Sequence, residues 1–230
     1  MIIKEHLFTD MIELQVALEE KLLSTLSKAV VDRGHAVMAV PGGSTPVHLF
    51  KSLAKKDFNW KDITITLTDE RWVDKTHPDS NENRLRSHFI DHINATFIPL
   101  KNDAATAREG QQVTEQMLER VNFPMDICLL GMGEDGHIAS LFPEAPELGK
   151  AIDIHSKQRC IAMTPPNMPQ ERISLTLNTL INTRQIILLI QGDKKRKVYL
   201  KAKESTDHII PPVGHILHQS HAPIDVYWAA

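Results

Sequence analysis

Residues 36–46 read Ala36-Val37-Met38-Ala39-Val40-Pro41-Gly42-Gly43-Ser44-Thr45-Pro46. The apolar run is too short for a helix and stops abruptly at Pro41, which predicts a buried strand that ends in a glycine turn. Ser44 or Thr45 can then cap a helix whose first turn admits Pro46. The stretch therefore predicts a strand, a loop and a helix in direct succession.

The same succession recurs along the chain. Apolar spacing predicts an amphipathic helix over about residues 10–31 and further helices near 81–92 and 104–120. Strands are predicted at residues 63–67, 127–130, 160–163, 185–190 and 224–228, with a basic helix after Gly192. Strands that alternate with helices predict an α/β fold, a doubly wound parallel sheet covered on both faces.

Composition limits the function classes. The 230 residues fit a single domain, and the net charge of -3 provides no global positive field for nucleic acid or an anionic membrane. The N-terminus carries no apolar segment typical of a secretory signal, and no run reaches the ~20 apolar residues of a membrane helix. Cys128 and Cys160 sit in apolar runs, which argues against a disulfide and predicts a cytoplasmic protein.

Ligands of such sheets gather where strands end. At the first such place, Gly42 and Gly43 allow close backbone approach, and the following helix start favours a phosphate. An ordinary tight turn is the alternative. At the second, Thr68-Asp69-Glu70-Arg71-Trp72, the guanidinium of Arg71 suits a carbonyl or carboxylate, and a solvated, salt-bridged loop is the alternative.

The third segment, residues 131–143, reads Gly-Met-Gly-Glu-Asp-Gly-His-Ile-Ala-Ser-Leu-Phe-Pro. We expect His137 in the first turn of a following helix, where the positive helix end keeps the imidazole neutral and able to accept a proton. Backbone N–H groups of the same loop are candidates to stabilise an oxyanion. A structural histidine that caps a turn is the alternative.

Arg172 and Lys195 are candidates to neutralise a phosphate dianion, whereas Lys194, Arg196 and Lys197 are expected on a solvated helix face. His215, His218 and His221 recur every third residue, but no cysteine accompanies them and Pro223 interrupts the segment. No metal site and no other cofactor are expected. The chain has no G-x-S-x-G motif, which disfavours a serine nucleophile.

In this order, Gly-Gly-Ser-Thr-Pro, Asp-Glu-Arg, Ser80-Asn81, Gly-Met-Gly-x-Asp-Gly-His, Ala-Ser-Leu-Phe-Pro, Arg-Ile-Ser-Leu-Thr and Gly-x-x-Lys resemble the 6-phosphogluconolactonase family. The resemblance implies a modified doubly wound, Rossmann-like sheet, shared with the glucosamine-6-phosphate deaminases. It also implies hydrolysis of 6-phosphogluconolactone in the pentose phosphate pathway, by a monomer or weak homo-oligomer whose partner is a small sugar-phosphate lactone.

Carried over by position, the resemblance makes His137 the general base and places Arg71 near the lactone carbonyl. Asp69 and Asp135 orient these groups, and Asn81 contacts sugar hydroxyls. The phosphate would be held by Gly42, Gly43, Ser44, Thr45, Arg172 and Lys195.

Two departures keep alternatives open. Lactonases often carry threonine after the catalytic histidine, where this chain has Ile138, as the deaminases do. The deaminases continue with a phenylalanine and a catalytic glutamate, where residues 140–143 read Ser-Leu-Phe-Pro, and the missing glutamate argues against ring opening with loss of an amine. A deaminase or sugar-phosphate isomerase is therefore the second enzyme hypothesis. A non-catalytic sugar-phosphate sensor is the third.

Overall fold

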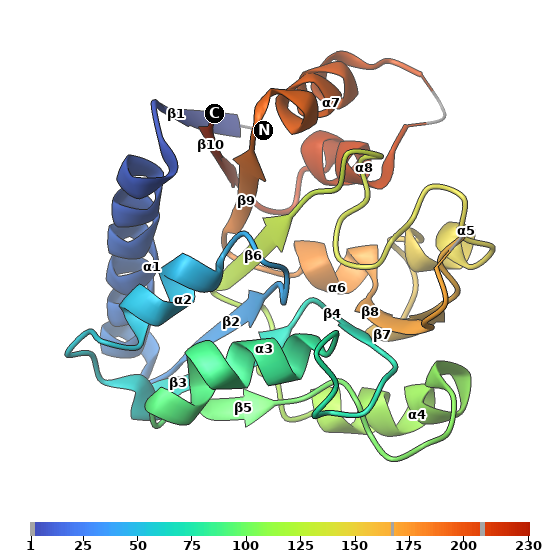
Figure 1. Cartoon of the computed structure of the whole chain (residues 1–230), viewed down its shortest axis with the longest axis horizontal. Coiled ribbons are helices and arrows are strands. Elements are labelled where there is room, and N and C mark those ends of the chain that lie inside the picture. The colour runs from blue at the N-terminus through green and yellow to red at the C-terminus, as the bar shows by residue number, and fades with distance from the viewer. Residues whose placement is uncertain (1–2, 167, 208–209) are drawn as a thin grey trace.

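A computed structural model describes residues 3–166, 168–207 and 210–230. Met1 and Ile2, the first residues of the N-terminal segment that was not expected to be a secretory signal, lie outside the described residues. Within this part of the chain, seven strands form one parallel sheet in the order β1-β10-β9-β6-β2-β3-β5 (Figure 1). The strands are β1 (Ile3–Phe8), β2 (Ala36–Val40), β3 (Ile63–Leu67), β5 (Thr96–Ile98), β6 (Ile127–Gly131), β9 (Ile186–Gln191) and β10 (Ile224–Ala229). The predicted parallel α/β sheet is confirmed.

Helix α1 (Met11–Arg33) shows how local sequence sets the elements. The Asp10 carboxylate accepts hydrogen bonds from the N–H groups of Ile12 and Glu13, and Gly34, at a φ of 78°, ends the helix. Its fully buried stripe packs on the sheet and consists of Leu14, Leu18, Leu22 and Leu26. The other α-helices are α2 (Val47–Leu53), α3 (Asn81–His88), α4 (Ala107–Leu118), α5 (Leu148–Ala151), α6 (Leu177–Ile181), α7 (Asp193–Glu204) and α8 (Pro212–His218).

A second, antiparallel sheet was not predicted. Its order is β4-β8-β7, formed by β4 (Asp69–Arg71), β8 (Arg172–Leu175) and β7 (Cys160–Met163). The chain leaves the large sheet at Thr68, whose N–H donates to Val40 and whose carbonyl accepts from Leu175. The alternative of a solvated loop at residues 68–72 is therefore wrong, because Thr68, Asp69 and Glu70 are buried and Asp69–Arg71 is a strand.

Chain direction fixes where a ligand can bind. From β2 the chain proceeds to β3 and β5 on one side, and from β6 to β9 and β10 on the other. The order therefore reverses between β2 and β6, and ligands of doubly wound sheets bind outside the carboxyl ends at such a point. Among the described residues, no helix is long and apolar enough to cross a membrane.

Candidate active site

A cavity of about 280 Å³ lies at the carboxyl ends of β2, β3, β6 and β9. Nine of the residues singled out by sequence line it: Gly43, Ser44, Thr45, Asp69, Arg71, Asn81, His137, Arg172 and Lys195. The remaining two are not part of the lining but are next to it, since Asp135 contacts His137 and Gly42 lies against the Asn81 side chain. Side chains far apart in sequence thus converge on one space, as strand-end placement requires.

His137 and Asp135 form the titratable pair of the cavity. Nδ1 of His137 lies 2.6 Å from Oδ1 of Asp135, and the ring packs on Phe142 with centroids 4.5 Å apart. A proton on Nδ1 satisfies the carboxylate and leaves Nε2 as an acceptor, without a hydrogen-bond partner among the described residues. Partial burial raises the pKa of Asp135, but the hydrogen bond and charge of His137 outweigh burial and lower it below the usual value. The arrangement suits a base with an ionised orienting partner.

The expected helix after His137 is absent. Residues 137–141 instead form a tight turn in which Ile138 pairs with Leu141, and Ala139 takes a left-handed φ of 48°. The helix-dipole argument for a neutral imidazole therefore does not apply. Three N–H groups of the loop already donate hydrogen bonds within it. That of Gly133 donates to the His137 carbonyl, that of Gly136 to the Gly133 carbonyl, and that of His137 to the Asp135 carboxylate. They are not free to bind an oxyanion.

Arg71 and Arg172 carry the positive charge of the cavity wall. They are direct partners in the antiparallel pairing of β4 with β8, and neither forms an ion pair with a described residue. The Nε atoms of both side chains are buried without a hydrogen-bond partner. Burial and the adjacent Arg71 charge lower the pKa of Arg172. The charges of Asp69, Glu70 and Asp79 offset this effect only in part. Two adjacent guanidinium groups without an ion-pair partner among the described residues make this wall suited to an anion.

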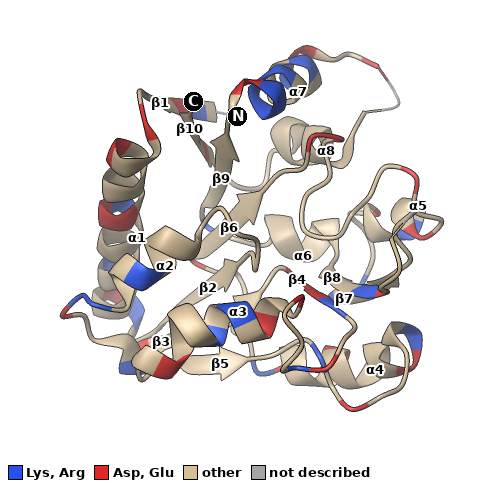
Figure 2. Ribbon diagram, viewed as in Figure 1, with Lys and Arg blue, Asp and Glu red and all other residues tan. Residues whose placement is uncertain are grey.

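Lys195 adds a third cation from the first turn of α7, whose run of basic residues is visible in Figure 2. The neighbouring cations behave as expected of the outer face: Lys194 lies 4.0 Å from Glu134, and Arg196 stacks over the Trp228 ring. Only Lys195 of this group lines the cavity.

The glycine turn supplies backbone donors. No hydrogen bond joins the N–H groups of Gly43, Ser44 or Thr45 to other described residues. The expected side-chain cap by Ser44 or Thr45 is wrong, since Pro46 occupies the cap position of α2 without one. Gly42 is required for another reason, because a Cβ there would lie 2.2 Å from the Asn81 side chain. Free N–H groups at the turn fit a phosphate.

Asp69 and Asn81 are held firmly. Oδ2 of Asp69 accepts a 2.5 Å hydrogen bond from the Ser140 hydroxyl, and both residues are buried. The Asn81 amide donates to the Asp69 carbonyl at 2.8 Å and accepts from Nη1 of Arg71 at 2.7 Å. These contacts fix the cavity floor before any ligand arrives.

Sequence reasoning assigned no role to Glu70 or Ser140, which the structure ties to the cavity wall. Glu70 is fully buried on the opposite side of β4 from Asp69 and Arg71. The alternation of side chains along Asp69-Glu70-Arg71 is the signal that would have found it, had these residues been interpreted as a strand.

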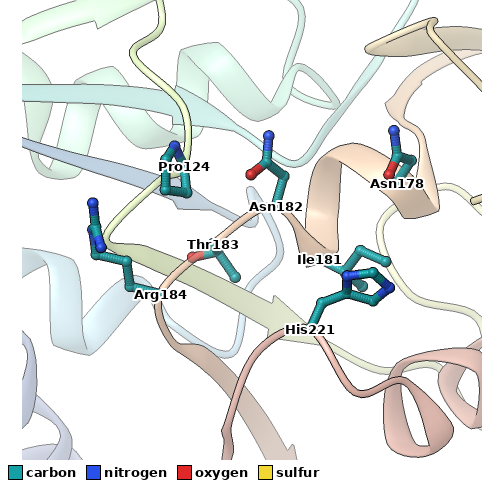
Figure 3. A pocket seen from close by; sticks show the side chains of 7 residues that line it. All are labelled: Pro124, Asn178, Ile181, Asn182, Thr183, Arg184 and His221. Atoms are coloured by element: carbon teal, nitrogen blue, oxygen red, sulfur yellow. The ribbon is translucent and has the colours of Figure 1, made fainter.

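A larger hollow of about 470 Å³ lies beside the amino ends of β6 and β9, at the other end of these strands from the cavity. Figure 3 shows its lining residues. Arg184 and His221 are its titratable lining residues. The Arg184 charge is already matched by Asp126 at 3.5 Å. Because the described lining of the larger hollow has no unpaired cation and no oriented base, the smaller cavity is the better candidate for the active site.

No group of three His, Cys, Asp or Glu side chains in the described part of the chain is arranged to hold a metal ion. In the segment with three histidines, Nε2 of His218 bonds the Ala202 carbonyl at 3.0 Å.

Known proteins resemble this chain along almost its whole length. The family model of glucosamine-6-phosphate isomerases/6-phosphogluconolactonase matches residues 9–228. A 6-phosphogluconolactonase of Pseudomonas aeruginosa is 34% identical over 92% of this chain and 88% of its own, and one of Rhizobium meliloti is 32% identical over 97% of each. The crystal structure of a 6-phosphogluconolactonase from Shewanella baltica gives a TM-score of 0.95 at 38% identity, covering 100% of this chain and 98% of that one. Similarity at this level runs through the whole sequence and not only its motifs, and the chain belongs to the glucosamine-6-phosphate isomerase/6-phosphogluconolactonase family.

Proposed function

We propose that this protein hydrolyses 6-phospho-D-glucono-1,5-lactone to 6-phosphogluconate, in the oxidative pentose phosphate pathway. The observation that carries the proposal is the Asp135–His137 pair, which presents a free Nε2 to a cavity whose wall holds Arg71 and Arg172. A base that faces unpaired cations suits an electrophilic substrate with a phosphate.

The reaction needs one proton carrier. Nε2 of His137 accepts a proton from water as the water oxygen attacks the lactone carbonyl carbon. The tetrahedral oxyanion then collapses, the bond from that carbon to the ring oxygen breaks, and the imidazolium returns its proton to the ring oxygen. The product is a hydroxy acid that ionises in solution. Asp135 stabilises the transient imidazolium.

The cations and backbone donors position the substrate. We assign the phosphate to Arg172, Lys195 and the N–H groups of residues 43–45, which have room for an anion. Arg71 is assigned to the carbonyl oxygen and the carboxylate that it becomes, and its hydrogen bond to Asn81, at 2.7 Å from Nη1, holds the guanidinium in place. Binding energy from the remote phosphate orients the reacting carbonyl.

The deaminase alternative requires an acid near the histidine, at the position that the deaminase motif fills with glutamate. Here Phe142 packs against the His137 ring, and the Asp69 carboxylate is bonded by Ser140. Neither contact favours ring opening with loss of an amine.

The test generates the lactone with glucose-6-phosphate dehydrogenase and follows ring opening above the spontaneous rate. Wild type should accelerate it, and His137→Ala should lose kcat by about 100- to 10,000-fold while it retains affinity for 6-phosphogluconate. Ammonia release from glucosamine 6-phosphate would instead support a deaminase. Binding without turnover would support a sensor.

We further propose that residues 1–230 act as one domain, since both sheets furnish residues to one cavity. The proposed setting is the cytoplasm, as a monomer or weak homo-oligomer. The cytoplasmic setting is supported by Cys128 and Cys160, because their thiols are buried and form no disulfide, which suits a reducing compartment.

A further inference from the structure

Glu70 is a buried carboxylate that no step of the proposed reaction uses. Its side chain is fully buried and does not line the cavity, and both carboxylate oxygens accept hydrogen bonds. Oε1 accepts from the N–H of Arg71 at 2.6 Å and of Asn81 at 2.7 Å. Oε2 accepts from the N–H of Glu82 at 2.7 Å and the hydroxyl of Ser80 at 3.1 Å.

These four donors come from two elements that meet at the cavity. Arg71 belongs to β4, whereas Ser80, Asn81 and Glu82 form the start of α3. Asn81 and Arg71 are in turn bonded to each other through their side chains at 2.7 Å. One carboxylate therefore joins the strand that carries the guanidinium to the helix that carries the amide.

We propose that Glu70 is a positioning residue for the lactone site, fixing Arg71 and Asn81 in the geometry that binds the reacting end of the substrate. The proposal rests on the proposed function and deepens it. An ionised carboxylate can accept from all four donors, whereas an amide turns an N–H₂ group toward at least one backbone N–H. A shift of about 1 Å in such a group can reduce turnover on the order of 100-fold.

The surroundings of Glu70 shift its pKa into a range where a change of its charge state can be measured. Burial, with a smaller contribution from the Asp69 charge, raises the pKa of its carboxyl to about 7, although the backbone N–H groups of Glu82, Asn81 and Arg71 act to lower it. Asp69 on β4 and Arg172 on β8 are the charged side chains that interact with it electrostatically, whereas Arg71 on β4 and Glu82 on α3 contact it through backbone N–H groups. Protonation of Glu70 near neutral pH would turn one of its oxygens from a hydrogen-bond acceptor into a donor, at the junction between β4 and α3.

The matched control is Asp126, a second buried carboxylate remote from the cavity. It is 3% exposed, accepts from the N–H of Val37 at 2.8 Å, and also pairs with Arg33 and Arg184. Asp126→Asn removes a buried charge from the fold as Glu70→Gln does, but leaves the β4–α3 junction intact.

The experiment measures kcat and KM at pH 8 for wild type, Glu70→Gln and Asp126→Asn, with circular dichroism and thermal unfolding as checks on folding. We expect Glu70→Gln to lose about tenfold or more in kcat/KM, while Asp126→Asn loses stability and stays within about twofold of wild-type kcat/KM. Folded Glu70→Gln with wild-type kcat and KM would overturn the proposal. An equal loss in both variants would also overturn it, since the effect would then be one of general stability.

A second readout does not depend on activity. The buried Nε–H of Arg71 should give a slowly exchanging side-chain signal in ¹⁵N NMR, and its protection should fall in Glu70→Gln but not in Asp126→Asn. If Glu70→Gln does not fold, the same protection factor in wild type should fall between pH 8 and pH 6. An unchanged protection factor would overturn the proposal. If wild type does not open the lactone, the proposed function fails, and this signal still decides the role of Glu70.

Discussion

Arg71 and Arg172 face each other across the β4–β8 pair, and the Nε of each is buried without a hydrogen-bond partner. Like charges this close are stable only if the fold holds them in place, and an anion between them would relieve their repulsion. The two guanidinium groups therefore destabilise the free protein and favour the binding of an anion, which leads to the first prediction.

Arg172→Gln should raise KM for the lactone by about 10- to 100-fold, the loss expected when hydrogen bonds to a charged group are removed. The melting temperature should stay the same or rise, because burial and Arg71 already disfavour the Arg172 cation. Initial rates and thermal unfolding measure the two effects. Arg108, whose side chain is 79% exposed, provides the control Arg108→Gln, with unchanged KM. An unchanged KM in Arg172→Gln would contradict the assignment of Arg172 to the phosphate.

Asp135→Asn should lower kcat on the order of 100-fold with little change in KM, since a neutral amide does not stabilise the imidazolium that forms during the reaction. The chain offers a matched control in Asp153, whose carboxylate accepts from the N–H of His155 two residues on, as Asp135 does from His137. Steady-state kinetics of Asp153→Asn should match wild type. Equal kcat values for the two variants would remove Asp135 from the mechanism.

Gly133→Ala should disable the base without unfolding the protein. An added Cβ would lie 2.2 Å from Nδ1 and 2.3 Å from Cε1 of His137, so the ring must leave its position beside Asp135. We expect a fall in kcat of about 100-fold, measured beside circular dichroism. Gly149→Ala, where an added Cβ would meet nothing within 4 Å beyond its own helix backbone and chain neighbours, should keep full activity. A fully active Gly133→Ala would show that the ring position is not critical.

Glu70 predicts a pH dependence of stability. Its pKa is raised from an ordinary 4.5 to about 7 in the folded protein, so the folded state holds the proton more tightly. This contribution to stability is complete below pH 4.5 and is lost as the pH rises through 7. Relative to Glu70→Gln, wild type should lose roughly 3 kcal/mol of unfolding free energy over that interval. Urea unfolding at several pH values measures the difference, and parallel profiles would refute it.

The middle of the large sheet could be predicted from sequence because β2, β6 and β9 are short apolar runs that end at or next to a glycine or proline, as in residues 36–41. Edge strand β1 was missed, since half of its residues are exposed and its partner β10 lies more than 200 residues away. The small sheet was missed for a different reason, although its strand β7 was predicted at residues 160–163. Asp69–Arg71 is a strand because it pairs with residues 172–174, and no local pattern of three residues specifies that pairing.

At the site, residue types and order were enough to predict which segments meet, because the carboxyl ends of neighbouring parallel strands share one edge. The conformation after His137 was not predictable in this way. Glycine, alanine and serine there resemble a helix start, but tertiary contacts decide: Ile138 and Leu141 are fully buried, and Ser140 bonds Asp69 from a distant strand.

His137 follows a strand of the large sheet, whereas Arg71 and Arg172 belong to the small one. The distance from the proton acceptor to these two guanidinium groups is thus set by the way the sheets are joined at Thr68, which bonds Val40 of one and Leu175 of the other. Substitutions at that junction, remote from any bound ligand, would then change which sugar lactones are accepted while every polar contact group stays the same.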